Sequence, residues 1–108
     1  MKENKLAELS IDFSVQIINL VKELKAKHET VISNQIGRSA TSIGANIREA
    51  NYAHSRADFI SKLQIALKEC YETEYWLELM RKSELISADI SSALLILLIL
   101  VYLCALFL

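Results

Sequence analysis

The sequence contains no proline and only two glycines in 108 residues. It therefore lacks the Pro- and Gly-containing dipeptides that mark β-turns, and with them the usual connections of β-hairpins. Hydrophobic residues make up 53% of the chain, and the many Leu, Ala, Glu and Lys residues favour helices. A chain of this length is one domain by size. We therefore predict an all-α protein with a single domain spanning residues 1–108.

Strong net charge, a secretion signal and a cysteine motif are also missing. The formal net charge is −1, so bulk electrostatics give no case for binding nucleic acid. The stretch MKENKLAELSIDF has no apolar run behind its charges, and Cys70 and Cys104 have no metal or redox spacing. We expect a cytoplasmic protein whose two cysteines are free thiols in apolar surroundings.

Apolar residues recur at intervals of three and four along the chain, which predicts amphipathic helices. We expect four helices, over residues 5–27, 33–54, 56–82 and 87–107. Ser55, followed three residues later by Asp58, forms a variant of the capping box at the start of the third helix. The third helix has more apolar surface than one stripe requires. Either a wide core face or a contact with another subunit explains that surplus.

The predicted second helix is unusually thin. Gly37 and Gly44 lie on one flank of its Ile and Ala stripe, and Ser39 and Asn46 lie on the other. A glycine inside a helix costs about 0.5–1 kcal/mol relative to alanine, so two at the same heptad position require an offsetting gain. We predict close helix packing at Gly37, Ser39, Ala40 and Gly44.

The last charged residue of the chain is Asp89, near the start of the predicted fourth helix, and the nineteen residues after it are all uncharged. At 1.5 Å per residue this run is about 28 Å long, near the lower limit for spanning a bilayer. Arg81 and Lys82 precede it, as the positive-inside rule requires of a tail anchor with a cytoplasmic N-terminal part. We favour burial in the bundle and its subunit interfaces, because three amphipathic helices need a fourth to close their core.

No catalytic or metal-binding pattern is present. His28 has no other metal-ligand residue at a suitable spacing, and His54 has only Asp58, four residues on. The hydroxyl residues Ser39, Thr41 and Ser42 lack a neighbouring base or a phosphate-binding loop. We predict a non-enzyme with no cofactor and no metal.

Three arginines form the best candidate contact surface for nucleic acid. Arg38 and Arg56 are eighteen residues apart, which on a continuous helix returns to one direction and places Glu49 and Tyr52 between them, with Arg48 beside the strip. Arginine and tyrosine can contact phosphates and stack on bases. A solvated face, or ion pairs with another subunit's acidic helix, explains the same pattern.

Two motifs in the middle of the chain carry a family resemblance. The R-S-A-x-S-I-x-x-N-I-x-E-A pattern falls at residues 38–50, and A-x-K-E-x-x-E-x-x-Y-W-L falls at residues 66–77. Together, in this order, they resemble the four-helix-bundle proteins encoded in intervening sequences of bacterial 23S ribosomal RNA genes. The resemblance is close over residues 35–80 and looser over the first helix.

The resemblance implies an up-and-down four-helix bundle that assembles into a ring, a pentamer, without catalytic activity. Relatives called accessory variability determinants, from diversity-generating retroelements, look similar and are thought to bind nucleic acid and a reverse transcriptase. The motif positions that it marks, for contact with RNA or between subunits, are Arg38, Asn46, Glu49, Glu69, Glu72, Tyr75 and Trp76. The uncharged last helix departs from the amphipathic one expected of the family.

Two functional hypotheses follow. The first is a cytoplasmic, homo-oligomeric binding or scaffold protein that contacts structured RNA or a nucleic-acid-processing partner, with candidate contacts at Arg38, Asn46, Arg48, Glu49, Tyr52, Arg56, Tyr75 and Trp76. The second is a membrane protein anchored by residues 90–108.

Overall fold

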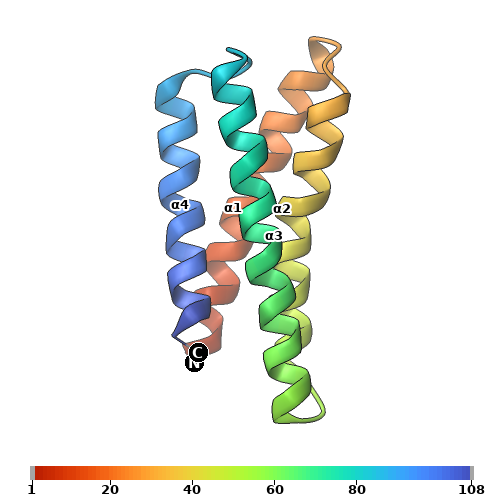
Figure 1. The fold of residues 1–108 in the computed structure, drawn as a ribbon, viewed down its shortest axis with the longest axis vertical. Coiled ribbons are helices and arrows are strands. Elements are labelled where there is room, and N and C mark those ends of the chain that lie inside the picture. The colour runs from red at the N-terminus through yellow and green to blue at the C-terminus, as the bar shows by residue number, and fades with distance from the viewer. Residues whose placement is uncertain (1, 108) are drawn as a thin grey trace.

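The computed structural model describes residues 2–107, with side chains from Lys5 to Phe107. Four helices account for nearly all of these residues: α1 Lys2–Ala26, α2 Val31–Asn51, α3 Arg56–Lys82 and α4 Ala88–Leu106. They run up and down in turn, so that the start of α1 and the end of α4 lie at the same end of the bundle (Figure 1). Within residues 2–107 each helix packs against its neighbours in sequence, and α4 also packs against α1. The predicted all-α architecture with four helices is confirmed.

The turns explain where the helices begin and end. The second helix begins at Val31, before the expected residue 33, because the Glu29 carboxylate accepts hydrogen bonds from the backbone N–H groups of Ile32 and Ser33 at 3.2 and 2.9 Å. At the start of α3, Ser55 Oγ accepts from Asp58 N at 3.1 Å, and Asp58 Oδ2 accepts from His54 N at 3.3 Å. This reciprocal capping fixes the turn between α2 and α3.

Neither glycine serves as a helix C-terminal residue. The left-handed positions that close α1 and α3 are occupied by His28, with φ 68°, and Glu84, with φ 62°. Each lies in a turn whose next N–H reaches back to the helix, as in Glu29 N to Leu24 O at 2.9 Å. Both glycines lie inside α2 instead.

The glycine flank of α2 faces α1. A Cβ added at Gly44 would lie 3.3 Å from Ser10 Oγ and 3.5 Å from Ser10 Cβ, whereas one at Gly37 would meet only Val21 Cγ2, at 3.5 Å. The opposite flank faces α3, because Ser39 Oγ is hydrogen bonded to Thr73 Oγ1 at 2.9 Å. The second helix therefore lies between two close neighbours, and Gly44 marks the tighter contact.

The core is a single apolar cluster that all four helices share. Its fully buried side chains include Phe13, Ile17, Ile36, Ile43, Ile47, Leu77, Met80 and Val101. The inner stripe of α4 joins it through Leu94, Leu98, Val101 and Ala105, each at most 4% exposed. The fourth helix therefore closes the core of the bundle.

The outer side of α4 is apolar as well. We define the outer α4 face as Ile96, Leu100, Leu103, Leu106 and Phe107, whose exposure ranges from 43% to 85%. Only 28% of the most apolar part of α4 is buried, and among the described residues it is the one helix long and apolar enough to cross a membrane. The bundle thus accounts for one side of this helix and leaves the other without a partner.

Candidate functional site

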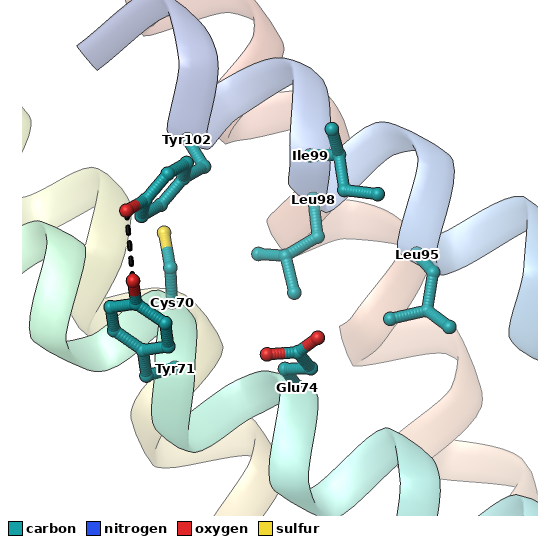
Figure 2. A pocket seen from close by; sticks show the side chains of 7 residues that line it. All are labelled: Cys70, Tyr71, Glu74, Leu95, Leu98, Ile99 and Tyr102. Carbon is teal, nitrogen blue, oxygen red and sulfur yellow. Dashed lines mark hydrogen bonds between the residues drawn. The ribbon is translucent and has the colours of Figure 1, made fainter. Parts of the chain in front are cut away.

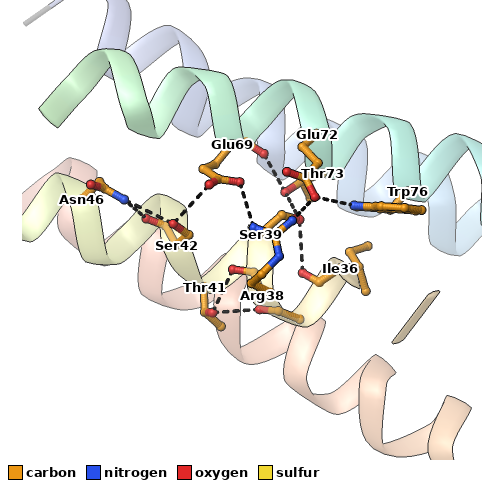
Figure 3. A network of polar contacts seen from close by, with 11 residues as sticks. Ile36, Arg38, Ser39, Thr41, Ser42, Asn46, Glu69, Glu72, Thr73 and Trp76 are labelled. Atoms are coloured by element: carbon orange, nitrogen blue, oxygen red, sulfur yellow. Dashed lines mark hydrogen bonds and ion pairs between the residues drawn. The ribbon is translucent and has the colours of Figure 1, made fainter. Parts of the chain in front are cut away.

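Most of the residues that carry the family motifs meet between α2 and α3 (Figure 3). The Arg38 guanidinium binds the Glu72 carboxylate and lies 3.6 Å from Glu69 Oε1. Glu72 also accepts a hydrogen bond from Trp76 Nε1 at 3.0 Å. The candidate contact Arg38 is therefore paired within its own chain.

The same contact continues inward and along the helices. Thr73 Oγ1 donates to Glu69 O at 2.8 Å, which leaves the Ser39 hydroxyl to donate to Thr73 in a fully buried pair. Asn46 Nδ2 donates to Ser42 O at 2.8 Å, and the Ser42 hydroxyl lies 3.5 Å from Glu69 Oε2. We call this set the α2–α3 network: Arg38, Ser39, Ser42, Asn46, Glu69, Glu72, Thr73 and Trp76. A buried pair with satisfied hydroxyls and a charged rim fixes how two helices align.

Glu49 is also paired across the two helices. Its Oε1 lies 2.9 Å from Lys62 Nζ. This hydrogen bond raises the pKa of Lys62 above its usual value, and the negative charge of Glu49 acts in the same direction. Glu49 therefore balances a basic side chain on α3 instead of interrupting a basic surface.

The predicted strip from Arg38 to Arg56 is wrong as a geometric unit. The second helix ends at Asn51, and Arg56 is the first residue of α3. Helical spacing therefore does not carry through Tyr52 to Arg56. The strip prediction failed because it counted residues across a turn.

The turn nevertheless leaves basic and aromatic side chains at one end of the bundle. Arg48, Tyr52 and Arg56 are exposed, Tyr52 at 81%. Neither arginine has an ion pair among residues 5–107. We call these three residues the α2–α3 end. Tyr75 lies elsewhere, exposed on α3 with its ring edge-on to Trp76 at 4.9 Å between centroids.

Within the described part of the chain, no group of three or more His, Cys, Asp or Glu residues is placed to hold a metal ion. The partners that the sequence did not predict are Ser42, Thr73 and Lys62. Their positions could have been found from antiparallel pairing of α2 with α3, since the residue numbers in each contact add to nearly the same value.

Cys70 provides a pH-dependent prediction. Burial raises the pKa of its thiol from 9.0 to about 12, and the negative charge of Glu69 adds to the shift. Between these values the unfolded chain binds fewer protons than the folded chain, so stability is retained below pH 9 and is lost as the pH rises. We expect the free energy of unfolding of the wild type to fall between pH 9 and 11 more steeply than that of Cys70→Ala, by up to about 1.4 kcal/mol per pH unit. Urea denaturation at each pH measures both slopes, and equal slopes would contradict this assignment.

Comparison with known proteins agrees with the fold and with the motifs in the network. The profile of the 23S rRNA-intervening sequence protein family matches residues 2–100. The chain belongs to this family.

A solved crystal structure is closely similar to this chain. It is the crystal structure of a protein with unknown function from the S23 ribosomal protein family of Bacteroides thetaiotaomicron VPI-5482. It shares 48% sequence identity, with a TM-score of 0.95 over 98% of this chain and 96% of that one. A search of curated proteins gave no match. The descriptions of the family and of the solved relative name no catalytic activity.

Proposed function

We propose that this protein is a non-enzymatic, homo-oligomeric helical-bundle scaffold of the cytoplasm. The observation that carries the proposal is the outer α4 face, an unbroken apolar surface on a helix whose inner side already completes the core. Contiguous exposed apolar surface marks an interaction site.

A second apolar stripe lies on α1, where Ile11, Val15 and Ile18 are 42–50% exposed. Surfaces on two different helices suit head-to-tail association, which closes into a ring when the rotation permits. A ring of five is the assembly that we propose.

The test is the molar mass of the full chain by size-exclusion chromatography with light scattering, in buffer without detergent. The proposal predicts a multiple of the 12.2 kDa subunit. A monomer would contradict it.

The second candidate function is a membrane protein anchored by residues 90–108, which the length and apolar composition of α4 favour. Insertion would withdraw Leu94, Leu98 and Val101 from the core. The apolar stripes of the remaining three helices would then face water where α4 had covered them, at about 1.5–3 kcal/mol for each large side chain exposed. We therefore place self-association first. A full chain that stays in solution only with detergent would reverse this order.

We further propose that the α2–α3 end contacts structured RNA or a nucleic-acid-processing partner such as a reverse transcriptase. Arg48 and Arg56 have no intrachain ion pair within the described residues. The exposed Tyr52 lies between them in the sequence. Arginine charges bind phosphates and an exposed tyrosine can stack on an unpaired base. Arg38 is excluded from this surface because Glu69 and Glu72 neutralise it.

We expect the double variant Arg48→Ala with Arg56→Ala to bind a fluorescently labelled stem-loop from 23S rRNA more weakly. The slope of log affinity against log salt should fall in magnitude by about 1.5–2, because two phosphate contacts are lost. The matched control is Lys22→Ala with Lys25→Ala, which removes the same charge from exposed positions near the C-terminal end of α1. Equal losses in both variants, or no loss in either, would contradict a contact at the α2–α3 end.

A further inference from the structure

A groove lies between α3 and α4 and is lined by side chains of both helices (Figure 2). Its volume is about 200 Å³. Leu95, Leu98 and Ile99 of α4 form an apolar wall. An apolar cavity of about 150 Å³ holds a molecule the size of benzene, so this groove admits one short aliphatic chain.

Two tyrosines close one end of the groove. Tyr71 Oη and Tyr102 Oη are 2.9 Å apart, and their rings meet edge to face with centroids 5.6 Å apart. This hydrogen bond raises the pKa of Tyr102, so its phenol stays neutral near pH 7. The pair therefore supplies aromatic surface without adding charge.

A carboxylate faces the same space. The Glu74 side chain lies beside Leu98 in Figure 2, and it has neither an ion pair nor a hydrogen bond within residues 5–107. Each of the neighbouring acids on the same helix, Glu69, Glu72 and Glu78, has a basic side chain within 4 Å. Within residues 5–107, Asp58 at the start of α3 also lacks an ion pair, but its carboxylate accepts a hydrogen bond from His54 N; Glu74 is the unpaired acid of α3 that lines the groove.

We propose that this groove binds a primary ammonium group carried on a short aliphatic chain. The chain would lie along the leucine and isoleucine wall, the ammonium would meet Glu74, and the tyrosine rings would face the cation. Carboxylates and aromatic faces both attract ammonium groups. A phosphate or carboxylate ligand would be repelled by Glu74. A free polyamine and a lysine side chain of a protein partner share the required chemistry.

The probe is n-butylamine, titrated into the full chain at pH 7 and followed by the NMR methyl signals of Leu95, Leu98 and Ile99. The neutral probe n-butanol has the same carbon chain. We expect saturable shifts with butylamine that are tighter than with butanol by up to about fivefold, and loss of that difference in Glu74→Gln. Glu78→Gln is the matched control, because Glu78 lies one turn away and pairs with Lys82.

Two further probes separate the sources of the amine. Binding of a blocked lysine amide as tight as that of butylamine would indicate a lysine side chain of a protein partner, whereas binding of putrescine but not of the blocked lysine would indicate a free polyamine. Equal binding of butylamine and butanol, or no effect of Glu74→Gln, would overturn the proposal. Light scattering on the same samples reports the assembly, so a failed groove and a failed oligomer remain distinguishable.

Discussion

Gly44→Leu is expected to lower the free energy of unfolding by up to about 2 kcal/mol. The first added carbon would already lie 3.3 Å from Ser10 Oγ, and the rest of the leucine side chain would extend into α1. Extra methylene groups in a packed contact force backbone or rotamer shifts that cost about 1–3 kcal/mol. Replacing glycine inside a helix returns roughly 1 kcal/mol of that cost. Thermal unfolding followed by circular dichroism should show a lower midpoint, by several degrees per kcal/mol for a domain of this size.

Two variants on the same helix control for this effect. Ala45→Leu places the same side chain at an exposed neighbouring position and should change stability by less than about 0.5 kcal/mol. Gly37→Ala should stabilise the protein by about 0.5–1 kcal/mol, because its new methyl group meets Val21 at an ordinary contact distance of 3.5 Å. A Gly44→Leu protein as stable as Ala45→Leu would show that α1 does not closely approach α2 at this position.

The double variant Ile96→Glu with Leu103→Glu is expected to convert the proposed oligomer into folded monomers. Both side chains belong to the outer α4 face, at 61% and 43% exposure, so the charges are solvated in a single bundle. In an assembly that covers this face they would be buried without partners, at a cost of several kcal/mol. We expect association to weaken at least about a hundredfold while the helical circular dichroism signal is retained, which sedimentation velocity and spectroscopy measure together.

The matched control is Asn34→Glu with Ala45→Glu, which adds the same charge to exposed positions of α2. It should leave the assembly intact. If the α4 variant remains oligomeric, the subunit contact lies elsewhere. If it unfolds, the less disruptive pair Leu100→Ser with Leu103→Ser tests the same face.

The sequence predicted the helices because its apolar residues have a clear helical period. Five α1 side chains on one helical stripe are each at most 7% exposed: Leu6, Phe13, Ile17, Leu20 and Leu24. The Ile and Ala stripe of α2 is buried as well. Periodicity could not decide how α4 is used, since a helix that is apolar on all sides has no marked inner face. Only the packed structure separates its buried side, such as Leu98, from its exposed side.

The candidate site could be predicted less well, because its residues act in pairs between helices. Arg38 and Tyr52 looked alike as members of one basic and aromatic strip. Their roles differ because α3 runs antiparallel to α2: Arg38 pairs with Glu72, and Glu49 pairs with Lys62. Residue numbers add to 110 in the first pair and 111 in the second. This nearly constant sum tells which residues of α2 and α3 face each other, which spacing within one helix cannot tell. It can be used only when the alignment of the two helices is known.

The most direct test of the proposed assembly is sedimentation equilibrium of the full wild-type chain, without detergent, over a hundredfold range of concentration. Burial of the outer α4 face between subunits predicts a mass well above the 12.2 kDa of one chain, and the proposed ring predicts five times that value across the range. A mass of one subunit at every concentration, or a chain that remains in solution only in detergent, would contradict it.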